Sequence, residues 1–67
     1  MNRAAQVSLL RWLRRQLQQP TPVREHLEAA VENNDPSEVR RLLADVPFTE
    51  AQRRHVANML DAWDESP

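Results

Sequence analysis

The chain contains no cysteine, which removes two of the usual supports of a small fold. A protein of 67 residues buries only about 60% of the surface that its unfolded chain exposes, so its core alone is marginal. Small domains commonly add disulfides, a metal or a partner chain. Disulfides and thiolate metal sites are excluded here. Because His26 and His55 are far apart in the sequence, we expect no metal and no cofactor.

Glycine, lysine, isoleucine and tyrosine are also missing. Without glycine, the chain cannot form the Gly-rich loops that cradle phosphates in nucleotide-binding enzymes. No His-Glu-x-x-His spacing occurs, and no serine lies in a nucleophile-elbow motif. A chain this short is also poorly able to enclose a pocket that excludes water. We therefore expect that the protein is not an enzyme.

Long apolar runs are absent as well. No stretch approaches the roughly 18 apolar residues of a membrane-spanning helix. The amino terminus lacks the basic, apolar and small-residue order of a secretion signal. The sequence thus predicts a soluble, cytoplasmic protein with no membrane span. All nine basic residues are arginine, a bias typical of a GC-rich genome, which favours a bacterial or phage source.

Prolines divide the chain into four segments, each with apolar residues at helical spacing. Alternating runs of β-branched residues, which would indicate strands, do not occur. The predicted fold class is therefore all-α, a small bundle of about four short helices joined by Pro-containing turns. Residues 1–67 form one domain in this interpretation. We expect its helices over residues 3–18, 22–33, 36–45 and 50–64.

Three of the breaks carry residues that begin helices. Thr21 and Asp35 each precede a proline, and proline is well tolerated at the first position of a helix. Asp35 and Thr49 also begin patterns that resemble a capping box. Asn33 and Asn34 tolerate a left-handed helix end better than most residues. Because the connections are short, the three later helices should stack as successive hairpins, whereas the first could close the bundle or stand apart.

The charges are divided sharply along the chain. Residues 1–24 carry five arginines and no acid, whereas residues 25–67 carry four arginines and ten acids. Residues 1–19 therefore form a basic amphipathic helix, and residues 22–65 a three-helix scaffold. In the first helix, an arginine side opposes an apolar arc that is wider than the ~100° needed for packing on a core.

Surplus apolar surface on a small monomer indicates an interface, and Trp and Arg are enriched at binding hot spots. We therefore predict a small helical protein–protein interaction module that acts as an adaptor, inhibitor or regulatory subunit. Its partner would be another protein or a second copy, with a homodimer expected. The predicted partner-binding residues are Leu9, Leu10, Arg11, Trp12, Leu13, Arg14, Arg15, Leu17 and Trp63.

Other interpretations stay open at this point. The arginines could be no more than the solvated side of a bundle helix, and both tryptophans could lie in the core. A small dimeric nucleic-acid-associated regulator could use the same basic helix. The overall net charge of −1 disfavours nucleic acid, because such domains are usually basic overall. Attachment of the first helix to an anionic membrane surface is a third alternative.

Overall fold

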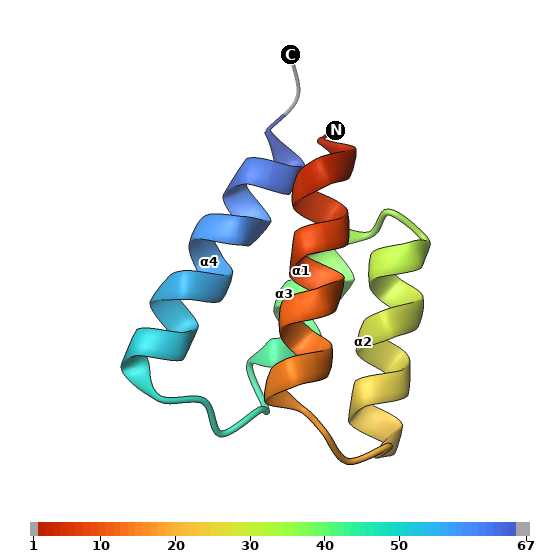
Figure 1. The fold of residues 1–67 in the computed structure, drawn as a ribbon, viewed down its shortest axis with the longest axis vertical. Coiled ribbons are helices and arrows are strands. Elements are labelled where there is room, and N and C mark those ends of the chain that lie inside the picture. The colour runs from red at the N-terminus through yellow and green to blue at the C-terminus, as the bar shows by residue number, and fades with distance from the viewer. Residues whose placement is uncertain (1, 66–67) are drawn as a thin grey trace.

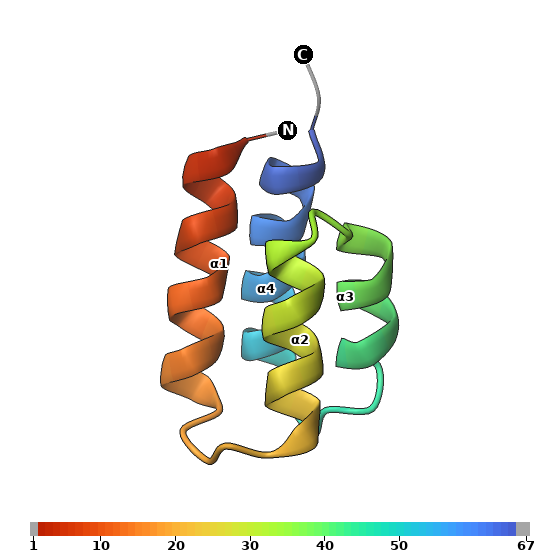
Figure 2. The same ribbon diagram turned by 90° about the vertical axis from the view of Figure 1, so that its right-hand side faces the viewer.

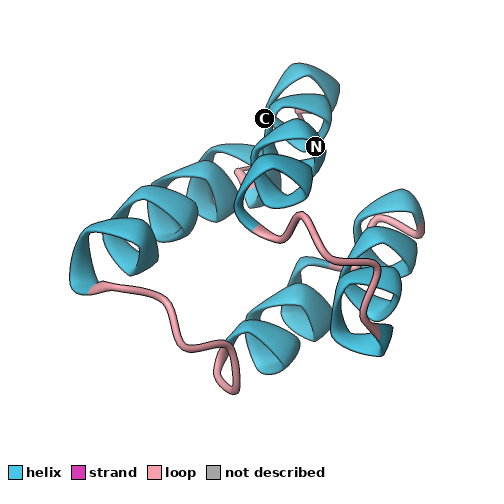
Figure 3. Cartoon of the chain, turned by 60° about the horizontal axis from the view of Figure 1, so that its bottom comes forward, coloured by secondary structure: helices cyan, strands magenta, loops and turns pink. Residues whose placement is uncertain are grey.

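The computed structural model describes residues 2–65, which form four α-helices (Figure 1). Helix α1 spans Arg3–Gln16, α2 spans Pro22–Glu32, α3 spans Pro36–Leu43 and α4 spans Glu50–Asp64. Loops join these helices, and no strand occurs in the described part of the chain (Figure 3). The predicted all-α class is confirmed. None of the four helices is long and apolar enough to cross a bilayer.

The helices begin where the capping residues predicted. The side chains of Thr21 and Asp35 each accept a hydrogen bond from the backbone N–H three residues later, at 3.3 and 3.1 Å. At the start of α4, Thr49 and Gln52 form a complete capping box, with reciprocal bonds of 2.8 and 3.1 Å. Such caps contribute about 1 kcal/mol each, which matters for helices this short.

The ends of α1 and α2 fall short of their predicted positions by one or two residues. Helix α1 stops at Gln16, because Leu17 leaves the helical region with φ −109° and ψ 74°. Helix α2 stops at Glu32, and Asn33 is its C-cap. Asn34 then adopts the left-handed conformation, with φ 56°, as its residue type predicted.

Helix α3 departs from its prediction at both ends. At its start, the carboxylate of Glu38 pairs with Arg41 instead of returning to the backbone of Asp35, so the expected capping exchange is one-sided. At its end, the helix stops at Leu43 and not at residue 45. The backbone N–H groups of residues 44–46 bond to carbonyls three residues earlier, a tightening that ends the α-helical pattern.

The helices alternate in direction and form an antiparallel bundle (Figures 1 and 2). Helix α1 closes this bundle, because it packs on both α4 and α2, and most extensively on α4. Of the expected successive hairpins, α2 packs closely on α3, whereas the contact between α3 and α4 is the weakest of the four packed helix pairs. The start of α1 and the end of α4 lie at the same end of the bundle, where the N–H of Asn2 donates to the carbonyl of Trp63 at 3.2 Å.

All four helices contribute to one core. Trp12 lies at its edge, with its ring 5.4 Å from the rings of both Phe48 and His55, measured between centroids. Trp63 has no exposed surface. The remaining buried apolar residues are Leu9, Leu13, Leu27, Ala30, Val31, Val39, Leu43, Val46, Val56 and Leu60.

Candidate interaction surface on helix α1

The apolar side of α1 packs in the core of the molecule. Leu9 and Leu13 have no exposed surface, and Trp12 keeps only 7% of its own exposed. Trp63, the predicted contact from the last helix, is fully enclosed. The expectation of surplus apolar surface on this helix is therefore corrected, because α4 and α2 both pack on α1 and its apolar residues join the core. These four side chains could reach a partner only if the bundle opened.

Two other predicted contacts lie at the margin of this buried arc. Leu10 and Leu17 are half-buried and pack against the core. They are the parts of the predicted apolar surface that solvent still reaches. The free apolar area is therefore much smaller than the sequence of the helix suggested.

The opposite side of α1 carries the three arginines of the prediction. Arg11, Arg14 and Arg15 are exposed, and together with Ser8 they line an open hollow of about 520 Å³. Their place near the end of the helix is locally favourable, because cations there interact with the negative C-terminal end of the helix dipole. We call these residues, with Arg3, Ala4 and Val7, the outer face of α1.

Arg14 is also tied into the fold through Glu28 of α2. The Glu28 carboxylate accepts hydrogen bonds from Arg14 and from Arg24, each at 2.9 Å. Arg24 additionally donates to the carbonyls of Leu17 and Gln18, which lie just beyond the end of α1. The guanidinium of Arg24, followed by that of Arg14, holds the pKa of Glu28 below its ordinary value. This cluster fixes the turn between the two helices.

The other arginines of the outer face have no such partner. Within residues 2–65, Arg3, Arg11 and Arg15 take part in no ion pair. The arginines of α3 and α4 are engaged: Arg40 pairs with Asp61 and Asp64, Arg41 with Glu38 and Arg54 with Glu50, while Arg53 donates to the carbonyl of Val46. Unneutralised positive charge is therefore concentrated on one side of one helix.

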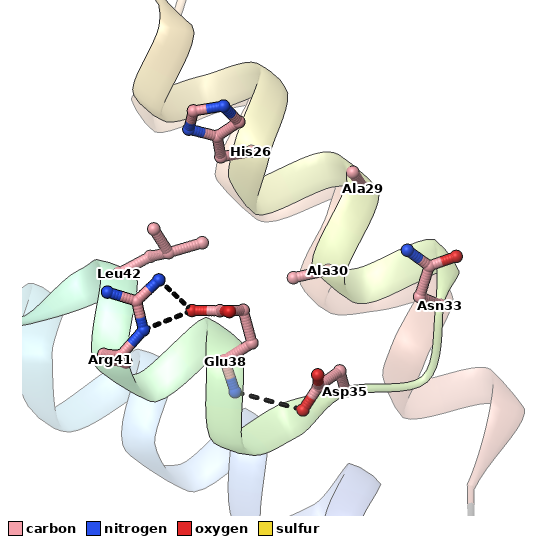
Figure 4. Close-up of a pocket in the computed structure, with 8 residues that line it drawn as sticks. All are labelled: His26, Ala29, Ala30, Asn33, Asp35, Glu38, Arg41 and Leu42. Atoms are coloured by element: carbon pink, nitrogen blue, oxygen red, sulfur yellow. Dashed lines mark hydrogen bonds and ion pairs between the residues drawn. The ribbon is translucent and has the colours of Figure 1, made fainter.

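Two grooves elsewhere on the molecule are weaker candidates. The groove between α2 and α3 has a volume of about 340 Å³ and is lined by the residues shown in Figure 4. Its charged groups engage one another, because Asp35 caps the N–H of Glu38 and the Glu38 carboxylate pairs with Arg41 (Figure 4). The groove between α3 and α4 is smaller, about 230 Å³. Two of its charged lining residues, Arg40 and Asp61, likewise form an ion pair with each other.

No group of three or more His, Asp or Glu side chains is arranged to hold a metal ion between residues 2 and 65. His26 lines the groove between α2 and α3. The ring of His55, on α4, lies 5.4 Å from that of Trp12 and is tilted by 49° against it. The two imidazoles therefore occupy separate environments.

Several polar contacts around α1 were not predicted. The amide of Gln6 donates to the carbonyl of Val31 at 2.6 Å, and the side chains of Gln16 and Gln52 join α1 to α4 at 2.8 Å. The role of Glu28 was also missed. Glu28 follows Arg24 by four residues in one helix, a spacing from which this ion pair could have been predicted. Its contact with Arg14 of α1 could not, because that contact depends on how the two helices pack.

Comparison of the chain with protein-family models, with curated proteins and with solved structures found no match.

Proposed function

We propose that this protein is a small helical protein–protein interaction module whose outer face on α1 binds an acidic partner. Such a module would act as an adaptor, inhibitor or regulatory subunit by occluding or tethering its target. The observation that carries the proposal is the position of Arg3, Arg11 and Arg15, which have no ion pair within residues 2–65. Charged groups of this kind steer association and fix orientation.

The contribution of each predicted residue differs in this proposal. Arg11, Arg14 and Arg15 make the direct contacts, and the half-buried Leu10 and Leu17 add apolar area at the margin. The buried residues of α1 act indirectly, because they hold the helix in place. A bacterial or phage cytoplasm stays the predicted location, on composition alone.

Self-association through α1 is a less favourable use of this surface. A two-fold contact between the outer faces of two copies would bring together two surfaces that each carry four arginines and no acid. Like charges placed opposite each other destabilise an interface. The predicted homodimer would therefore require another surface, and we propose a different protein as the main partner of the outer face.

The test is an affinity pull-down from native lysate, with and without nuclease, followed by mass spectrometry. The bait is compared with the double variant Arg11→Gln/Arg15→Gln. The matched control is Arg41→Gln/Arg54→Gln, which removes the same charge from α3 and α4, where the side chains are 71% and 76% exposed. We expect one protein at near-stoichiometric yield that resists nuclease and is lost only with the α1 variant.

Nucleic acid is the alternative that this experiment separates. Recovery that collapses after nuclease treatment would replace the acidic protein with a phosphate backbone as the partner. Recovery that both double variants reduce equally would mean that overall charge, and not the outer face of α1, controls binding.

A further inference from the structure

The outer face of α1 has two chemically different halves. At 100° per residue, Ala4, Val7 and Ser8 share the solvent side of the helix with Arg11 and Arg15. Val7 is 39% exposed, one of the two large apolar residues that the described chain leaves open to this degree. The first half of the face therefore carries small and apolar side chains beside one arginine, Arg3, whereas the second half carries three arginines. The full face is about 18 Å long at 1.5 Å per residue.

We propose that the element bound by this face is an acidic amphipathic helix of the partner protein. This inference rests on the proposed function and specifies its partner. The bound helix runs antiparallel to α1. Its first two turns place carboxylates over Arg11, Arg14 and Arg15, and its third turn places an apolar side chain against Val7.

The chemistry of the arginines favours carboxylates on a helix. A guanidinium forms paired hydrogen bonds with a carboxylate, which fixes direction as well as distance. Side chains three and four residues apart share one side of a helix, so glutamates with this spacing match the spacing of Arg11, Arg14 and Arg15. Packed helices lie 8–10 Å apart, as a general rule, and the small side chains of Ala4 and Ser8 permit such an approach.

The antiparallel direction follows from the order of the two halves. Three of the four arginines of the face lie near the C-terminal end of α1, so an antiparallel helix places its N-terminal turns over these three. Carboxylates in the first turns of a helix are stabilised by that helix's own dipole. Carboxylates in the first turns of the partner helix thus stabilise both its helical conformation and its contact with α1.

A phosphate backbone fits this face less well. Contact with the apolar side chain of Val7 does not stabilise a bound phosphodiester backbone, which is charged. Glu25 and Glu32 are exposed on α2, which packs beside α1, and their carboxylates would repel a long polyanion. A short helix that covers only α1 avoids them.

The probe is a synthetic peptide of about 15 residues, capped at both ends, since shorter helices are marginal in water. It carries glutamates at helical spacing in its first two turns and leucine in the third. Two control peptides replace the glutamates by glutamine or the leucine by serine. A single-stranded oligonucleotide of random sequence is titrated under the same salt conditions. Binding is followed by NMR chemical-shift changes of the 67-residue protein.

We expect the acidic peptide to shift the amides of α1, with binding weakened about tenfold by Arg11→Gln/Arg15→Gln, since two exposed ion pairs are lost. Val7→Ser should weaken the leucine peptide about three- to fivefold and leave the serine peptide nearly unchanged. Circular dichroism of each variant checks that the fold is intact. The inference is overturned if the acidic peptide does not bind, if Val7→Ser has no selective effect, or if the oligonucleotide binds more tightly than the peptide.

Failure of this inference can be distinguished from failure of the proposed function. If the peptide does not bind but the lysate partner is still lost with Arg11→Gln/Arg15→Gln, only the helical form of the partner element is wrong. If neither the peptide nor a lysate protein depends on these arginines, the outer face of α1 is not a protein-binding surface.

Discussion

Leu13 and Arg14 are neighbours in the sequence, yet the first has no exposed surface and the second side chain is 48% exposed. The same contrast separates the two sides of α1 along its length. The inner side is closed by α4 and α2 and belongs to the core. The outer side keeps three arginines without an ion pair in the described part of the chain. Stability and binding are thus assigned to opposite sides of one helix, and each can be changed separately.

The largest effect is expected on the inner side. Leu13→Ala should lower the free energy of unfolding by about 2–5 kcal/mol, since it removes buried methyl groups and leaves a cavity. The whole domain is expected to have only about 3–10 kcal/mol at 0.05–0.15 kcal/mol per residue. The variant should therefore be largely unfolded or melt far below the wild type in circular dichroism. A variant that melts like the wild type would mean that α1 is not part of the core.

An intermediate effect is expected where the two sides meet. Glu28→Gln should cost about 1 kcal/mol, because Arg14 and Arg24 lose a shared carboxylate that is only 19% exposed. Urea denaturation at neutral pH measures this loss. A loss of unfolding free energy no larger than that caused by Arg40→Gln, which removes exposed ion pairs, would show that the cluster does not fix the turn between α1 and α2.

The same carboxylate makes a prediction about pH. The pKa of Glu28 is lower in the folded protein than its ordinary value of 4.5. Its contribution is therefore complete above the unfolded pKa and is lost as the pH falls toward the folded pKa. Wild type and Glu28→Gln should differ most near pH 7 and converge under acid conditions. A difference between them that stays constant down to pH 2–3 would contradict this assignment.

A smaller effect is expected at the least packed contact. Arg40 pairs with Asp61 and Asp64 between α3 and α4, but the two carboxylate side chains are 77% and 45% exposed. Arg40→Gln should therefore change the free energy of unfolding by no more than about 0.5 kcal/mol, and by less at high salt. A loss as large as that of Glu28→Gln would mean that this contact holds α3 in place.

The smallest effect on stability belongs to the outer side. Arg11→Gln/Arg15→Gln should leave the free energy of unfolding within about 0.5 kcal/mol of the wild type, as is usual for exposed substitutions. The double variant should nevertheless lose the partner. A large destabilisation by these substitutions would show that the arginines support the fold, and the proposal for binding would then lack its basis.

The helix starts could be read from the sequence because their chemistry is local. Thr21, Asp35 and Thr49 cap the helices that follow them, as their residue types and spacing predicted. The helix ends were less accurate, since a departure such as that of Leu17 depends on the turn that follows.

The division of α1 could be read only in part. The helical periodicity placed Leu13 and Arg14 on different sides, but it did not indicate how much of the apolar arc the bundle would cover. That coverage depends on α4, which packs more extensively on α1 than on α3, through contacts distant in the sequence. The contact between Arg14 and Glu28 was unpredictable for the same reason, whereas the spacing of Arg24 and Glu28 was visible.

The central claim is that the apolar side of α1 is buried in the core of the bundle. Acrylamide quenching of tryptophan fluorescence in the free wild-type protein tests this burial most directly. Trp12 and Trp63 are the two tryptophans of the chain, and they retain 7% and 0% of their surface exposed. We predict that both are strongly shielded from the quencher, and that shielding disappears in urea as the bundle unfolds. If a substantial share of the emission is quenched in the native protein as readily as in the unfolded chain, the apolar side of α1 is open to solvent and the account is contradicted.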